Sequence, residues 1–406
     1  MRHRKIIKVL GLVLIFSCAI SSCKKNDTLF SGGQETQNVI DISNQTTRMP
    51  SESRPVINQE DLVIERLEFD ETNTRVNGKI SELIEIDASL LVTVDPLSPG
   101  SASSYTAIYR SFSEPQRMMF VQPGWSLIES EFRPAFGEYD DEYLDVYEDS
   151  TGQIHYCNVL SESASYYTPV GNLIWQIEVP PKYYSQTDFD FMTEPEAFEL
   201  AHNYLESFGY EIHDYHLTSR LSYEELEISS RLMDQTIVEK ALPQGWTSEQ
   251  DAYRFTLFVN IDGLPMNSYT GVPLSEEYEV QIGTVCEVIV TPKGIEYVDI
   301  FFQYTDAESQ TTAEMINIED ALVQLSQYLY PSYEEFILPV KVVDIQLVYL
   351  GQWKTSTGEV LLRPFWVFNT EQESVGLSGV LAQHIYYVDA LSMKMTDEFT
   401  FAGGEL

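Results

Sequence analysis

Histidine side chains are scarce candidates for chemistry in this chain, and only His213 and His216 lie close together, in the stretch IHDYHLTSRL. Two histidines three residues apart can bind one metal ion when they lie on a helix or a turn. This stretch has the pattern of a strand, however, and residues at this spacing then point to opposite faces. We therefore expect polar surface residues here and no metal site.

Carboxylates are abundant, since 63 of the 406 residues are Asp or Glu. Seven of them lie between Glu138 and Asp149, but the run lacks the alternating oxygen ligands and central glycine of an EF-hand calcium loop. We expect a solvated acidic face there. Two acids that folding brings together can cleave glycosides without any sequence signature, so a carboxylate-based hydrolase stays open as an alternative.

Sequence motifs of the common enzyme classes are missing. H-E-x-x-H, G-x-S-x-G, P-loop and G-x-G-x-x-G spacings do not occur. The sequence therefore lacks the motifs that identify zinc proteases, serine hydrolases and nucleotide-binding proteins. The sequence therefore names no catalytic residue, no metal ligand and no cofactor. We expect a non-catalytic role, with an enzyme as the second possibility.

The N-terminal segment has the pattern of an export signal. Four basic residues lie within the first eight positions, and an apolar run over residues 9–20 follows. That run is shorter than the roughly 20 residues that cross a bilayer as a helix, whereas a basic segment before a short apolar one is typical of export. No later apolar run approaches spanning length, so we expect the rest of the chain outside the cytoplasm.

The residues after the apolar run, Ile20-Ser21-Ser22-Cys23, resemble the lipobox of bacterial lipoproteins. This resemblance implies that residues 1–22 are a cleaved signal peptide and that Cys23 becomes a lipidated N-terminus, anchored to the extracytoplasmic face of the cell membrane. Two acyl chains hold a protein on a bilayer durably. Cys18 would leave with the signal peptide.

The charge of the chain excludes one class of partner. Removing residues 1–23 leaves 20 of the 24 basic residues against 63 acidic residues. A chain of this charge is not expected to bind nucleic acid, because such binding depends on basic contacts with phosphates. It attracts cations or basic proteins, or the charge serves solubility alone.

Two cysteines remain beyond the lipobox, Cys157 and Cys286. Each lies in a strand-like apolar stretch, and free cysteine is commonly buried. An exported protein can also form a disulfide. We favour two unpaired structural thiols.

The first part of the chain is expected to be a tether followed by a β-rich unit. Residues 23–60 are polar and lack an apolar period, which is typical of a flexible linker. Residues 61–185 form the predicted β-rich domain. Its expected elements are strands at 83–96, 104–112 and 172–181 and a hairpin within 139–160 that turns at 150–152.

Two helix-plus-sheet modules are predicted next, at 193–310 and 311–406, which makes the fold class α+β. Thr193 and Glu196 have capping-box spacing before an apolar helical stripe, and Asn317 precedes another. The remaining expected elements are a helix at 222–242, a helix at 318–330, hairpins at 253–267 and 285–304, and strands at 342–353, 359–370 and 382–399.

The stretches PFWVF and VDALSMKM near the C-terminus resemble the core strand and turn of PepSY-like or cystatin-like modules, including those of YycH/YycI-type regulators. Met393 stands where that turn usually has glycine. The whole chain also resembles lipoproteins of clostridia-like bacteria, which implies a location and no reaction.

Anchor, tether and repeated modules together favour a membrane-anchored extracytoplasmic lipoprotein that binds or regulates another envelope protein. The alternative is a cell-envelope hydrolase that uses carboxylates, for which we expect a concave pocket containing a carboxylate of raised pKa.

Overall fold

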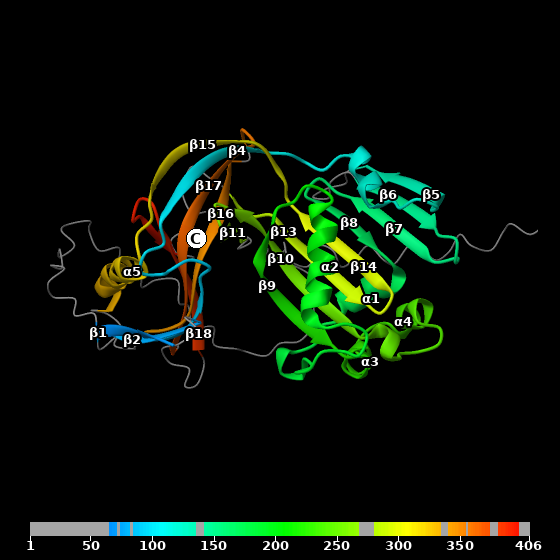
Figure 1. The fold of residues 1–406 in the computed structure, drawn as a ribbon, viewed down its shortest axis with the longest axis horizontal. Helices are drawn as coiled ribbons and strands as arrows, with labels where there is room; N and C mark the ends of the chain where they lie inside the picture. The colour runs from blue at the N-terminus through cyan, green and yellow to red at the C-terminus, as the bar shows by residue number, and fades with distance from the viewer. Residues whose placement is uncertain are drawn as a thin grey trace, which may run out of the picture. The chain divides into compact units, whose positions relative to one another are not determined.

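The computed structural model describes residues 65–70, 74–81, 84–134, 142–267, 280–333, 340–354, 356–373 and 381–397 (Figure 1). The expected signal peptide, lipidated cysteine and tether lie outside these residues. The described chain is α+β, as predicted, with a β-rich N-terminal region.

One sheet combines strands from both ends of the chain. Its members are β1 (Glu65–Phe69), β2 (Arg75–Ser81), β3 (Ile84–Leu91), β4 (Ser101–Tyr109), β12 (Val280–Ile282), β15 (Tyr304–Glu314), β16 (Val340–Lys354), β17 (Glu359–Glu373), β18 (Leu381–Asp389) and β19 (Met395–Asp397). The antiparallel β16–β17 hairpin pairs with β3, β12, β4 and β18. β3 joins it in parallel.

The other sheet uses the middle of the chain. Its members are β5 (Ser126–Arg133), β6 (Glu142–Glu148), β7 (Ile154–Val159), β8 (Ser163–Tyr167), β9 (Ile212–Leu221), β10 (Ala252–Ile261), β11 (Leu264–Pro265), β13 (Val285–Thr291) and β14 (Gly294–Phe301). The hairpins predicted within 139–160, 253–267 and 285–304 are confirmed as β6–β7, β10–β11 and β13–β14.

The described α-helices run from 7 to 16 residues. They are α1 (Pro169–Gln176), α2 (Glu194–Glu206), α3 (Tyr223–Ser230), α4 (Gln235–Ala241) and α5 (Ile318–Tyr333), with 3-10 turns η3 (Glu114–Phe120), η4 (Pro181–Tyr183) and η5 (Ser248–Gln250). Within the described residues, no helix has the length and apolar character that crossing a membrane requires. The predicted caps are confirmed: Thr193 and Glu196 form a capping box, and Asn317 Oδ1 accepts from the Asp320 N–H at 2.8 Å.

Two predicted elements are wrong. Residues 172–181 do not form a strand, because Thr168 caps a helix at Pro169 and the helix buries Leu173 and Ile174. The single helix predicted over 222–242 is broken into α3 and α4, where Asp234 caps the second helix by accepting from the Thr236 N–H.

Strand pairing does not follow the units predicted from the sequence. β1 to β4 lie in the predicted 61–185 unit, yet they share a sheet with β12 and β15 to β19, whereas β5 to β8 join β9, β10, β11, β13 and β14. Local alternation identifies a strand but not its neighbour, and these neighbours come from distant parts of the chain.

Each sheet has its own apolar core. α5 packs in the cluster of the first sheet, where Trp366 and Tyr349 are fully buried. α2 lies on one face of the second sheet (Figure 1), over Tyr253 and Phe255 of β10. The opposite face of that sheet receives α1, α3 and α4.

Asp262, in the tight turn between β10 and β11, connects the two sheets. Its carboxylate accepts hydrogen bonds from the Tyr105 hydroxyl at 2.7 Å, the Tyr349 hydroxyl at 2.8 Å and the Ser103 N–H at 3.0 Å. Burial alone would raise the pKa of Asp262, but these donors hold it below its usual value. The contact therefore contributes more to stability when the carboxylate is ionised than when it is protonated.

Met393 occupies the turn after β18 with a φ of 60°, the left-handed conformation that glycine adopts freely. Its N–H donates to the Asp389 carbonyl at 2.9 Å, and its side chain is half exposed. We expect Met393→Gly to raise the free energy of unfolding by about 1 kcal/mol, because the strain of a side chain in this region disappears. Urea unfolding measures the change, and a less stable variant would contradict this reading of the turn.

Candidate functional site

The histidine pair lies on β9, as the strand prediction required. His213 Nε2 lies 3.1 Å from the Gly263 carbonyl, and the His216 ring stacks on Phe198 at 3.9 Å. Within the described ranges, no group of three or more His, Cys, Asp or Glu residues is arranged to hold a metal ion. A cavity of about 360 Å³ beside β9 is lined in part by His216 and by the Arg220–Glu194 ion pair.

The acidic run is described only from Glu142 onward, and the predicted solvated face is wrong for two of its acids. Glu142 is buried and pairs with Arg133 at 3.0 Å, and Asp145 is buried and pairs with Arg117 at 2.9 Å. Asp149 instead accepts from the Thr151 N–H and hydroxyl in the β6–β7 turn. These acids therefore organise the hairpin.

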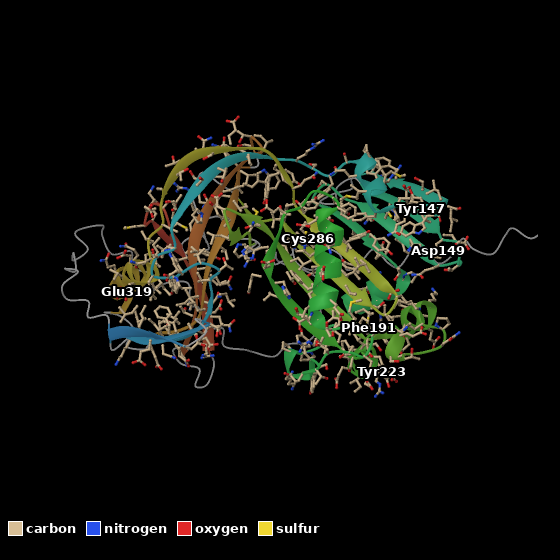
Figure 2. The ribbon with its side chains drawn as sticks, viewed as in Figure 1. Tyr147, Asp149, Phe191, Tyr223, Cys286 and Glu319 are labelled. Atoms are coloured by element: carbon tan, nitrogen blue, oxygen red, sulfur yellow. The ribbon has the colours of Figure 1, made fainter. Side chains whose placement is uncertain are left out.

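Both cysteines are unpaired and buried, as predicted. Cys286 lies in the cluster beneath α2 (Figure 2). Burial raises the pKa of the Cys157 thiol to about 12 and raises that of Cys286 as well. Neither thiol is reactive in this state, since the thiolate is the nucleophile.

Trp125, His155 and Tyr166 form an aromatic cluster against the core of the second sheet. The Trp125 ring stacks on His155 at 3.9 Å, and His155 Nδ1 lies 3.2 Å from the Tyr166 hydroxyl. Burial lowers the pKa of His155, although Asp149 opposes the shift. His155 and Tyr166 are buried in this cluster, and Trp125 is partly buried.

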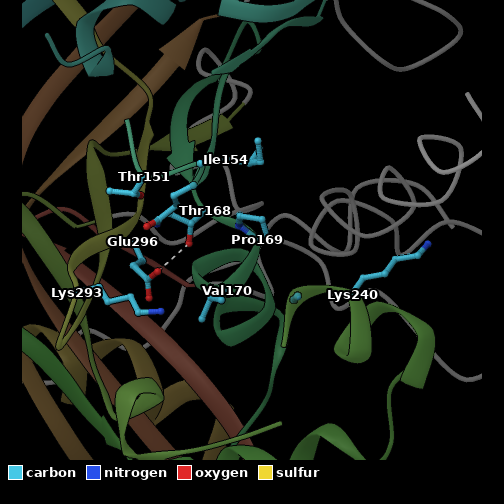
Figure 3. Close-up of a pocket in the computed structure, with 11 residues that line it drawn as sticks. Thr151, Ile154, Thr168, Pro169, Val170, Lys240, Lys293 and Glu296 are labelled. Carbon is cyan, nitrogen blue, oxygen red and sulfur yellow. Dashed lines mark hydrogen bonds between the residues drawn. The ribbon is translucent and has the colours of Figure 1, made fainter. Parts of the chain in front are cut away.

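A second cavity of about 360 Å³ surrounds the start of α1 and contains Glu296 (Figure 3). Glu296 accepts hydrogen bonds from the hydroxyls of Thr168 at 3.2 Å and Thr291 at 2.9 Å. Burial raises its pKa. Glu296 is the only acid among the lining residues described, so this pocket has a carboxylate of raised pKa but no second one to act with it.

The wall of this cavity depends on a close contact between α1 and β14. A side-chain carbon added to Gly171 would lie 2.0 Å from the Glu296 carbonyl oxygen. The Thr168 N–H donates to that same carbonyl at 2.9 Å. Glycine is therefore required where the helix meets the strand.

A pair of carboxylates lies on the neighbouring strands β13 and β14. Glu287 and Asp299 are directly opposite in the ladder. Glu287 accepts from Trp175 Nε1 at 2.6 Å and from Arg254 at 3.3 Å. Asp299 is buried, and among the described residues its Oδ1 atom has no hydrogen-bond partner. Burial, and then the Glu287 charge, raise the pKa of Asp299 well above its usual value.

The raised pKa predicts a stability that falls as pH rises. The folded state holds the Asp299 proton above the unfolded pKa of about 3.9, so stability is lost as pH increases from there toward the folded value. We expect Asp299→Asn to unfold like the parent near pH 4 and to be more stable than the parent near pH 7, because the amide has no proton to lose. Urea unfolding at both pH values tests this, with the exposed Asp190→Asn as control. An equal effect of both variants would contradict the prediction.

The free edge of the second sheet is the surface best suited to a partner. β5 is the last strand of that sheet (Figure 1), and β6 is its one strand neighbour in the described chain. Leu127, Ile128 and Phe132 are 56%, 53% and 51% exposed, so the strand presents apolar side chains to solvent. Tyr147 and Asp149 lie at the same end of the sheet (Figure 2).

Sequence reasoning missed this strand. The run SLIESEFR contains strand-forming Ile and Phe and is bounded by Gly124 and Pro134, which is the signal that could have found it. Even so, the run itself does not reveal whether a strand lies in the middle of a sheet or at its edge.

No protein-family model and no curated protein sequence matches this chain. Among solved structures, an uncharacterised protein from Eubacterium rectale has a similar fold, with a TM-score of 0.58 and 15% sequence identity. The similarity covers 80% of this chain and 93% of the other. At this identity the likeness shows a shared fold alone.

Proposed function

We propose that this protein is an extracytoplasmic lipoprotein, anchored through a lipid on Cys23, that serves as a non-catalytic binding or regulatory module for another protein of the cell envelope. The observation that supports this role is the β5 edge, with its three exposed apolar side chains. A strand edge carries backbone N–H and C=O groups that can pair with another chain.

The proposed anchor and tether fit this role. Residues 23–60 have the composition of a flexible linker, whose root-mean-square reach is roughly 35 Å. A folded body held at that distance can meet proteins at the membrane surface while its acidic side chains stay clear of anionic lipid.

Site-specific crosslinking in intact cells tests the proposal. A photoreactive residue at Ile128 is compared with one at Ile228, because the two isoleucines are 53% and 52% exposed and lie on β5 and α3. We expect one envelope protein to be captured reproducibly from position 128 and not from position 228. Failure to capture any partner from the lipidated full chain, together with turnover of wall material, would overturn the proposal.

The acid pair of Glu287 and Asp299 favours a second candidate, a cell-envelope hydrolase. Burial and the Glu287 charge raise the pKa of Asp299, and Glu287 accepts hydrogen bonds from Trp175 and Arg254. Glycoside hydrolysis uses two carboxyl groups, one of which has a raised pKa. Release of sugars from purified wall glycan, lost in both Glu287→Gln and Asp299→Asn, would support this role over the first. No release by the parent chain would exclude it.

A further inference from the structure

The two faces of β5 differ in chemistry. Leu127 lies opposite Tyr147 and Phe132 opposite Tyr143, whose ring is 4.8 Å from that of Phe132. The same face also carries the Ser130–Asp145 pair, but Asp145 is buried and paired with Arg117, so β5 itself presents two apolar side chains and one serine here. A bulge at Ile128 separates this pattern from the strict alternation that runs from Glu129 to Arg133.

The other face of the edge is acidic. This face carries four carboxylates and one guanidinium. Glu129, Glu131 and Arg133 belong to β5, and Glu142 and Glu148 belong to β6. The ladder pairs on this face are Ser126–Glu148, Glu129–Val146, Glu131–Leu144 and Arg133–Glu142. Arg133 already pairs with Glu131 and Glu142. Glu129 is exposed, and it has no basic partner among the described residues, so negative charge remains available at the edge.

We propose that the partner adds an extended strand to the free edge of β5, and that this strand alternates apolar residues with Lys or Arg. The inference rests on the proposed binding function and specifies the chemistry of the partner. Side chains of an added strand alternate between faces, so one set meets Leu127 and Phe132 while the other meets Glu129 and Glu131. Backbone pairing supplies affinity and the two faces supply specificity.

A second copy of this chain is not expected to pair with the β5 edge. Two copies would bring the acidic faces of both edges together, and each chain carries a net charge of −39. Like charges placed directly opposite each other are destabilising. The same charge attracts and steers a basic segment.

Peptide binding to the full-length protein tests the inference. The probe is a synthetic peptide as long as β5 that alternates lysine with valine, and its control has the same composition with all lysines before all valines. We expect the alternating peptide to bind more tightly, to weaken with added salt, and to protect the β5 amides from hydrogen exchange.

Charge reversal locates the site. Glu129→Lys with Glu131→Lys should weaken binding of the alternating peptide by about tenfold, because lysine replaces the Glu129 charge, unpaired among the described residues, and the second change also removes one of the two acidic partners of Arg133. The control reverses two exposed acids elsewhere, Glu199→Lys with Glu239→Lys, which changes the net charge equally. Thermal unfolding confirms that both variants fold.

Two outcomes would overturn the inference. One is equal weakening in both double variants, which would mean attraction to net charge alone. The other is exchange protection away from β5. If either occurs while Ile128 still captures an envelope protein in cells, the proposed binding function survives and only this account of its partner fails.

Discussion

Replacing Cys23 with alanine should leave the protein without lipid and without cleavage at the Ser22–Cys23 bond. The lipobox resemblance implies that the thiol is acylated first and that the signal peptidase requires the modified cysteine. Each methylene of an acyl chain buried in a bilayer contributes about 0.8 kcal/mol, whereas the bare apolar run of residues 9–20 is too short to span it. The variant should therefore stay as a precursor or be shed.

Metabolic labelling with a fatty-acid analogue and mass spectrometry of the N-terminal peptide measure this effect. Cys18→Ala is the matched control, because it removes the neighbouring thiol and should leave labelling and cleavage unchanged. An unmodified mature N-terminus at a residue other than Cys23 would remove the anchor, and with it the proposed location.

Gly171→Ala should destabilise the fold by about 3 kcal/mol or more, the upper range for overpacking a core. The added carbon would lie 2.0 Å from the Glu296 carbonyl oxygen and 2.5 Å from its carbon, and both belong to the backbone of β14. A backbone inside a sheet cannot move aside as a flexible side chain can. α1 would have to move away from β14, which would expose Leu173 and Ile174 to solvent.

Gly245→Ala is the control for this prediction. Gly245 has a φ of 79° and nothing within 4 Å of the added carbon, so its replacement should cost only the roughly 1–2 kcal/mol of left-handed strain. Urea unfolding compares the two variants. Equal losses would show that the close contact between α1 and β14 contributes nothing specific.

The helix α1 shows where sequence reasoning failed within the fold. The run NLIWQIEVPP is apolar on several consecutive positions, which suits a buried strand as well as a buried helix. The deciding signal lies upstream, in Thr168 as N-cap and Pro169 in the first turn. α2 was predicted correctly because its capping box directly precedes a clear helical stripe.

Less of the candidate functional sites than of the fold could be predicted from the sequence. Glu287 and Asp299 come together through a hairpin that was predicted, yet the hydrogen bonds of Glu287 come from Trp175 of α1 and Arg254 of β10, which the hairpin alone does not specify. The importance of β5 depends on which strands pair with it, and alternation along one strand does not record its partners. Local elements were therefore accessible from the sequence, and their neighbours were not.

Because β3 pairs in parallel with β16, the first sheet cannot be completed until a strand near the end of the chain is present. A chain that crosses the membrane with its N-terminus first, as proposed, delivers β1 to β3 long before their sheet partner arrives. The second sheet, whose strands lie between Ser126 and Phe301, can close in the interval. Until β16 emerges, β3 is an unpaired edge open to wrong pairing and to proteases. A chain that ends before β16 should therefore leave β1 to β3 without their sheet partner. Proteases of the envelope would then degrade such a chain from its N-terminal strands as well as from its C-terminal end.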